Sequence, residues 1–288
     1  MDKVVLIDKP QGLTSQQAVS ALKRALRVRR AGHTGTLDPI ATGLLLVLTG
    51  EATKASRLFM ELPKEYHTRV RLGQRTDTFD ADGRVIATAD VSALTAQAIS
   101  EVLGRFRGLI RQTPPMYSAL KHQGQPLYKL ARRGIEVKRP ERTVEVQTLE
   151  LLEFTPPYAE LLIICSRGTY VRSLVDDIGM ALGVYAHIAG LVRTRIGPFS
   201  LEDAATLKQL REGTASASAL LELDEALGFL PELRLSPAQY ERARHGAPFS
   251  TGARPFSGTV RLKDPWGKLF AIGRAEAGRA RVERMFHL

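Results

Sequence analysis

The sequence has little cysteine and no long apolar segment. Its single cysteine, Cys165, excludes an internal disulfide, and the apolar residues 161–164 before it predict a buried small side chain more readily than a catalytic thiol. The longest apolar run, residues 44–48, is far shorter than the roughly 20 residues of a membrane-spanning helix. The N-terminus lacks the apolar stretch of a secretory signal. We therefore expect a cytoplasmic protein that does not associate with membranes.

Histidine and cysteine do not cluster along the chain. The six histidines, at positions 33, 67, 122, 187, 245 and 287, lack the close spacing that zinc ligands show. The glycine patterns of serine hydrolases and of dinucleotide-binding enzymes, Gly-x-Ser-x-Gly and Gly-x-Gly-x-x-Gly, do not occur either. We therefore expect no dependence on a metal, and the commonest signs of serine hydrolases and dinucleotide-binding enzymes are missing.

Basic residues exceed acidic ones by a wide margin. Forty-one Lys and Arg against 30 Asp and Glu give a formal net charge of +11. Such a charge attracts a polyanion before any specific contact forms, so nucleic acid is the leading partner. A membrane surface would require an amphipathic basic helix or a lipidation signal, and neither is evident. The 288 residues, 44% of them hydrophobic, predict a globular protein with one large and one small domain.

Several helices and strands are predicted from local patterns. Thr14 and Gln17 form a capping-box pattern before apolar residues at helical spacing. A later helix is expected from Tyr170, with Thr169 as its N-cap. Strand patterns occur at residues 43–49, 64–73, 143–154 and 158–166, and an acidic turn occurs at residues 76–83.

Arg172 has an unfavourable place in the predicted helix. It falls in the first turn, where the helix dipole disfavours a cation. An anion near the guanidinium would offset this cost. Asp176, four residues further on, could supply it in a surface pair, and the alternative is an anion from elsewhere in the fold or from a substrate.

Two segments concentrate the basic residues. Residues 112–142 combine seven Lys and Arg with two tyrosines and paired prolines, which is typical of a surface that binds phosphates and stacks bases, although a solvated loop would look similar. Residues 232–288 hold eleven Lys and Arg against five Asp and Glu. Strand patterns there predict a small β-rich domain that binds nucleic acid.

The glycine-punctuated loop at residues 32–39 does not match a phosphate-binding loop. The Gly-Lys-Ser/Thr ending is missing, and the carboxylate of Asp38 lies where it would repel a phosphate. Pro39 restricts the backbone of Asp38, and the flanking glycines allow close approach. On spacing alone, Asp38 is as well explained as a turn residue.

Four sequence blocks occur in a characteristic order: Lys-Pro-Gln-Gly-Leu-Thr-Ser at residues 9–15, the Gly-His-Thr-Gly-x-Leu-Asp-Pro loop within residues 32–43, residues 66–73 with 75–77, and Arg-Gly-Thr-Tyr-Val-Arg at residues 167–172. Together these blocks resemble the TruB family of pseudouridine synthases. The likeness covers about the first four-fifths of the chain, and the tail resembles a PUA RNA-binding domain.

The resemblance implies both a fold and an activity. The expected fold is an α+β pseudouridine synthase fold, with a central mixed, largely antiparallel sheet split by an active-site cleft. Residues 1–231 would form the catalytic domain, with the basic insertion at 112–142, and residues 232–288 a PUA-like domain. Bacterial members of the family convert uridine 55 in the T-loop of transfer RNA to pseudouridine, and this implies tRNA as the partner.

The resemblance also implies three catalytic residues. Asp38 would be the carboxylate that acts at the sugar and base, by attack on the ribose, attack on the base or removal of a ribose proton. Arg172 would keep that carboxylate ionised and oriented. Tyr66 would accept the proton from C5 of the base or stack on the flipped base.

Four further residues would bind the substrate or support the site. His33 would fill the space that the flipped nucleotide leaves. Tyr170 and Leu191 would line the base pocket, and Lys9, with Pro10, would brace the active-site loop. Without the resemblance, Tyr170 and Leu191 would be ordinary core residues.

Two other functions are compatible with these residues. One is a module that binds and folds tRNA without chemistry, although such a module has no use for a desolvated carboxylate among phosphates. The other is a guide-RNA-dependent synthase resembling dyskerin, which requires partner proteins. The basic insertion favours a stand-alone enzyme, so we expect a monomer without an obligatory protein partner.

Overall fold

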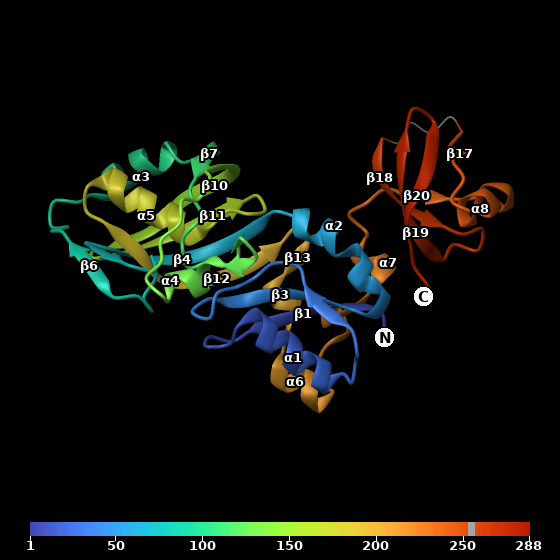
Figure 1. The fold of residues 1–288 in the computed structure, drawn as a ribbon, viewed down its shortest axis with the longest axis horizontal. Helices are drawn as coiled ribbons and strands as arrows, with labels where there is room; N and C mark the ends of the chain where they lie inside the picture. The colour runs from blue at the N-terminus through green and yellow to red at the C-terminus, as the bar shows by residue number, and fades with distance from the viewer. Residues whose placement is uncertain (253–256) are drawn as a thin grey trace.

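The computed structural model describes residues 1–252 and 257–288 and contains two main β-sheets, each with its own helices (Figure 1). The first sheet runs in the order β14 (Ala205–Thr206), β1 (Lys3–Lys9), β3 (Thr42–Thr49), β12 (Ala186–Ile196), β4 (Lys64–Leu72), β11 (Tyr158–Cys165), β10 (Arg142–Thr155) and β7 (Gly108–Gln112). Three short strands join it: β2 (Ala31–His33) on β3, β13 (Phe199–Ser200) on β12, and β15 (Leu220–Glu222) on β1.

This sheet is mixed but largely antiparallel, as expected. Only the β1–β14 and β3–β12 pairs are parallel among its described strands. The β3–β12 pairing consists of Thr42 with Val192 and Gly43 with Arg193. These few pairs join two halves of the sheet that diverge on either side, so a cleft can open beside a continuous sheet.

Gly43 allows this junction to form. Its φ is +97°, and a Cβ atom there would clash with the backbone carbonyl of Arg193. Both the left-handed backbone and the close approach of β12 therefore require glycine at this position.

Helices pack against the first sheet. The longer ones are α1 (Ser15–Ala25), α3 (Ala96–Gly104) and α5 (Val171–Leu182), and the shorter ones are α2 (Ser56–Glu61), α4 (Leu127–Ala131), α6 (Leu207–Glu212) and α7 (Leu223–Ala226). Short 3₁₀ turns occur at Gly50–Ala55, Leu201–Asp203 and Ala217–Ala219. None of the helices within the described residues is long and apolar enough to span a membrane.

The beginning of α1 follows its sequence pattern, whereas that of α5 does not. Thr14 and Gln17 form the expected reciprocal capping box. The prediction of Thr169 as the N-cap of α5 is wrong, because Tyr170 occupies that position and the Thr169 hydroxyl donates to the carbonyl of Ser166. The Gln112 side chain instead accepts from the backbone N–H of Tyr170 at 2.7 Å and donates to its carbonyl at 3.0 Å.

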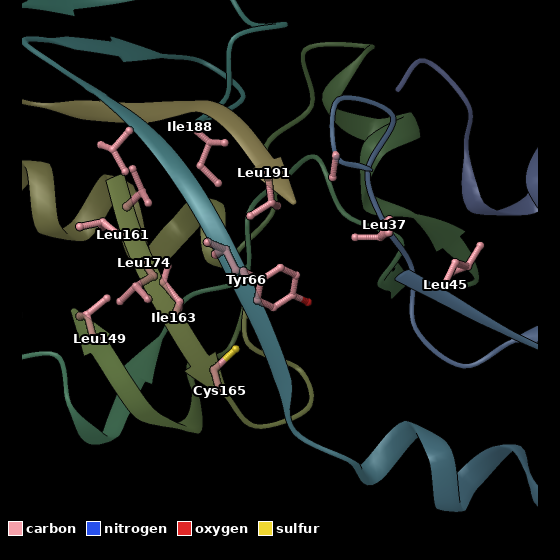
Figure 2. Close-up of a cluster of buried hydrophobic side chains, with 14 of the residues drawn as sticks. Leu37, Leu45, Tyr66, Leu149, Leu161, Ile163, Cys165, Leu174, Ile188 and Leu191 are labelled. Carbon is pink, nitrogen blue, oxygen red and sulfur yellow. The ribbon is translucent and has the colours of Figure 1, made fainter. Parts of the chain in front are cut away.

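The main core lies between the β-sheet and α1, α3 and α5. Figure 2 shows part of it, where side chains of β10, β11 and α5 gather on one side of β4. Cys165 belongs to this cluster and is buried, and burial raises the pKa of its thiol to about 11. The prediction of a buried small side chain is therefore confirmed.

The basic insertion and the acidic turn each form a small ribbon. Within residues 112–142, β8 (Lys121–His122) pairs with β9 (Gln125–Pro126) before α4. The acidic turn connects β5 (Gln74–Thr76) to β6 (Val85–Thr88). Each of the two segments contributes one backbone carbonyl near the cleft, that of Thr78 from the acidic turn and that of Tyr117 from the basic insertion.

The second sheet is formed by the C-terminal residues. Its order is β16 (Glu232–Arg234), β18 (Gly258–Lys263), β19 (Leu269–Glu276), β20 (Arg279–Met285) and β17 (Phe249–Ser250), with α8 (Pro237–Arg244) beside it. It has its own core, and its Leu269, Ile272 and Phe286 also pack in one cluster with Phe59 and Leu227. This shared cluster joins the second sheet to the first.

Candidate active site

Asp38 lies on the loop between β2 and β3, and the block at residues 9–15 braces this loop. The Ser15 hydroxyl accepts from the backbone N–H of Leu37 at 2.8 Å and donates to its carbonyl at 3.0 Å. The backbone N–H of Gly12 donates to the carbonyl of Pro39 at 2.8 Å. The residues on either side of Asp38 are therefore fixed by the segment that leads into α1.

Arg172 binds Asp38 and two other segments. Its Nε donates to Oδ2 of Asp38 at 2.9 Å, while its Nη1 and Nη2 donate to the carbonyls of Thr78 and Tyr117 at 2.9 and 2.7 Å. The guanidinium is 5% exposed, whereas the Asp38 side chain is 36% exposed. The cation is held inside the protein, and the carboxylate reaches the cleft.

Asp176 is not the partner of Arg172. Arg75 donates to both carboxylate oxygens of Asp176, at 2.6 and 2.7 Å. Of the two alternatives left open by the sequence, the surface pair within α5 is therefore wrong. The anion comes from the loop of Asp38.

A second carboxylate near Arg172, that of Asp80, was missed by the sequence reasoning. Its Oδ2 lies 3.6 Å from Nη1 of Arg172, and its Oδ1 accepts from the Thr78 hydroxyl at 2.6 Å. Burial raises the pKa of Asp80, and the Thr78 hydrogen bond and Arg172 oppose this shift. The acidic turn at residues 76–83 was the only signal, and it did not distinguish this aspartate from its neighbours.

Tyr66 is buried on β4 beside the cleft. In Figure 2 its ring lies near Leu191, and its hydroxyl points away from Leu161 and Ile163. Burial raises the pKa of the phenol, with Arg193 acting in the opposite direction. The hydroxyl is therefore protonated at neutral pH.

Two buried cations beside the cleft were also missed. Arg193, which is fully buried, donates from Nε to the Leu44 carbonyl at 2.7 Å and from Nη2 to the Gly35 carbonyl at 3.1 Å. Lys64 donates to the carbonyls of Met60 and Leu62, both at 2.6 Å, and burial lowers its pKa to about 8. Both belong to residue types that are rarely buried, so neither was identified as a site residue from the sequence.

The cleft between these elements has a volume of about 610 Å³, within the usual range for small-molecule sites. Its lining includes five of the predicted site residues, namely Asp38, Tyr66, Tyr170, Leu191 and Arg172, together with Lys64, Arg193 and residues 118–120 of the basic insertion.

The other two predicted residues, Lys9 and His33, do not line the cleft. Lys9 is fully buried and donates to the carbonyls of Pro10 and Leu13 at 2.9 and 2.8 Å. Burial lowers its pKa to about 8, and Asp38 opposes this shift. His33 is half-buried on β2, and burial lowers the pKa of its ring.

Two family models together match most of the chain. A family model for the TruB family pseudouridylate synthase N-terminal domain matches residues 23–171. A model for the tRNA pseudouridylate synthase B C-terminal domain matches residues 172–228.

Individual relatives match most of the chain. A tRNA pseudouridine synthase B from Pseudomonas aeruginosa is 45% identical over 94% of this chain and 90% of its own length. A protein of the same name from Azoarcus is 44% identical over 99% of this chain and 95% of its own length. A solved Cbf5-Nop10-Gar1 complex contains a chain with a TM-score of 0.75 and 28% identity, over 99% of this chain and 84% of that one. The chain belongs to the TruB family of pseudouridine synthases.

Proposed function

We propose that this enzyme converts uridine 55 in the T-loop of tRNA to pseudouridine. The coarser activity follows from the family: the chain isomerises uridine to pseudouridine in tRNA, as the names of its relatives state. The observation that supports the proposal most strongly is the Asp38–Arg172 pair, 2.9 Å apart at an open cleft.

Asp38 acts as the catalytic carboxylate. The reaction breaks the bond between the ribose C1′ and N1 of uracil, turns the base and forms a bond from C1′ to C5. A carboxylate beside the sugar can assist this glycosyl transfer as a nucleophile or as a base. Arg172 fixes the orientation of Asp38, because its other donors bind the carbonyls of Thr78 and Tyr117.

The residues around Asp38 hold the base. The raised pKa of Tyr66 keeps its phenol protonated, so stacking on the flipped base suits this ring better than acceptance of the C5 proton. Tyr170 and Leu191 close the pocket around the base. His33, outside the cleft, fills the space left in the RNA, and Lys9 braces the loop of Asp38 through the carbonyls of Pro10 and Leu13.

Two regions of the chain outside the active site bind RNA. Residues 1–231 form the catalytic domain, in which the insertion at residues 112–142 binds the T-arm. Residues 232–288 form a PUA-like RNA-binding domain. The enzyme works as a cytoplasmic monomer without a cofactor or an obligatory protein partner.

The two alternatives are not favoured. A module that only binds RNA has no need of a carboxylate paired with a buried arginine at a cleft. The curated relatives at 44–45% identity carry the name tRNA pseudouridine synthase B, whereas the Cbf5-containing structure is 28% identical.

The position of the modified uridine tests the proposal. An unmodified tRNA transcript would be incubated with the purified chain alone, and its pseudouridines would be mapped. We expect conversion at uridine 55, and none when that uridine is replaced by cytidine. Conversion only at another position would overturn the proposed specificity, and activity only after addition of a guide RNA would overturn the stand-alone mode.

A further inference from the structure

Trp266 is the only tryptophan of the chain and is 75% exposed. It lies on the turn between β18 and β19, whereas the apolar residues Val260, Leu262 and Ala271 of those strands are buried. A large aromatic side chain left in water forgoes the free energy of burial. Its exposure on a basic segment leaves the indole ring accessible to a ligand.

The turn that carries Trp266 is held in place on both sides. Oδ1 of Asp264, itself buried, accepts from the backbone N–H groups of Trp266 and Lys268 at 3.0 and 2.9 Å. Arg234 on β16 donates to the carbonyl of Pro265 through Nη2 at 2.7 Å and Nε at 3.2 Å. Because the backbone is fixed in advance, little conformational entropy is lost when Trp266 binds a ligand.

Tyr240 adjoins Trp266, and Phe270 and Arg244 in turn adjoin Tyr240. The Tyr240 ring on α8 meets it edge-on, with 6.1 Å between the ring centroids, and packs against Phe270 at 5.0 Å. The guanidinium of Arg244 lies 5.7 Å from the Tyr240 ring centroid. We call Trp266, Tyr240, Arg234 and Arg244 the Trp266 surface.

We propose that the Trp266 surface binds an unpaired nucleotide of the RNA substrate, with the base stacked on Trp266 and the adjacent phosphates near Arg234 and Arg244. Stacking on an exposed aromatic ring requires a base that is free of a partner strand, and arginines beside the ring suit the phosphates. The surplus of basic over acidic residues in 232–288 favours RNA over an acidic surface as the occupant.

This inference rests on the proposed function, because it takes tRNA as the ligand. The Trp266 surface is nevertheless separate from the catalytic cleft, whose lining contains none of its residues. The surface would therefore contribute to the affinity for RNA and leave the chemical step unchanged.

The fluorescence of Trp266 reports directly on its own site, since no other tryptophan contributes. The full chain would be titrated with a full-length tRNA transcript and with a blunt-ended RNA duplex of equal length. We expect saturable quenching by tRNA and little quenching by the duplex, because the duplex offers no unpaired bases. Equal quenching by both would overturn the proposal.

Two variants test the contribution of stacking to affinity. Trp266→Ala should bind tRNA about 5- to 150-fold more weakly, the range that corresponds to the loss of one base stack, and Trp266→Phe should retain most of the affinity. Leu109→Ala, which alters a similarly exposed apolar residue on β7, should leave the affinity unchanged. Unchanged affinity of Trp266→Ala would contradict the proposal.

Catalysis distinguishes this inference from the proposed function. At saturating tRNA labelled with tritium at C5 of uridine, Trp266→Ala should release tritium as fast as the wild type. If the wild type is active but its fluorescence is not quenched, the Trp266 surface is not a stacking site and the proposed function stands. If the wild type is inactive, the proposed function itself fails.

Discussion

At the scale of residues, individual buried cations hold in place the segments that line the cleft. Arg172 lies in the first turn of α5, where the helix dipole is unfavourable, and the carboxylates of Asp38 and Asp80 offset this cost. Local pattern predicted that Arg172 needs an anion, but only the family resemblance pointed to Asp38, because Asp38 is 134 residues away. Arg193 and Lys64 gave no signal, because arginine and lysine side chains are ordinarily exposed and the residue type alone does not show that one is buried.

The pKa of Lys9 makes stability depend on pH in a defined direction. Its folded-state pKa of about 8 lies below the ordinary 10.5, so the unfolded chain binds more protons between these values. Lys9 therefore destabilises the fold at low pH, and the penalty disappears as pH rises from about 8 to 10.5.

Lys9→Met should remove this pH dependence. Between pH 7 and pH 9.5, the wild type should gain about 1 to 2 kcal/mol of unfolding free energy relative to the variant, measured by urea denaturation at both pH values. Lys208→Met, at an exposed lysine, should follow the wild type. If wild type and Lys9→Met show parallel pH dependence, the assigned shift is wrong.

At the scale of elements, the sequence predicted well where local pattern decides. The strands at β3, β4, β10 and β11 and the capping box of α1 follow from alternation and from Thr14 and Gln17. The N-cap of α5 did not follow, because Gln112, 58 residues away, binds the backbone of Tyr170 instead. The pairing of β3 with β12 has no local sequence signature. Gly43 lies at the junction, but the requirement for glycine there becomes evident only when the two strands are seen to meet.

Gly43→Ala should disrupt the junction between the two halves of the sheet. The left-handed backbone and the clash with the Arg193 carbonyl predict a loss of about 2 to 4 kcal/mol of unfolding free energy. Activity should also fall, since Arg193 contacts the loop of Asp38 through Gly35. Urea denaturation and tritium release would measure both.

Gly32→Ala is the matched control for this substitution. It lies in the same sequence block, but a Cβ there has open space and no positive φ to oppose it. It should change stability by less than about 1 kcal/mol. Equal effects of the two substitutions would contradict the importance of the junction.

At the scale of the whole molecule, the two sheets are joined by apolar packing and by charge. Lys263 on β18 pairs with Asp224 at 2.8 Å, and Phe286 packs in the cluster with Phe59. Deletion of residues 232–288 would therefore expose apolar surface on the first sheet. Substitution of surface charges tests RNA binding by this part of the chain without exposing that apolar surface.

Arg274 and Arg281 form the clearest target for such a substitution. They are exposed and lie directly opposite each other on β19 and β20, an arrangement of like charges that an anion would relieve. Replacing both by Gln should weaken tRNA binding and reduce the salt dependence of log K by about one to two units of slope, with the turnover rate unchanged. An unaltered slope would show that these arginines do not contact phosphates.

The role of Asp38 is the central claim, and tritium release tests it most directly. The purified chain, without metal or nucleotide, would be mixed with a T-arm stem-loop labelled at C5 of uridine, alongside Asp38→Asn and the exposed control Asp203→Asn. We expect release by the wild type and the control, and a loss of at least about a thousandfold in Asp38→Asn with RNA affinity largely retained. Substantial release by purified Asp38→Asn would contradict the account.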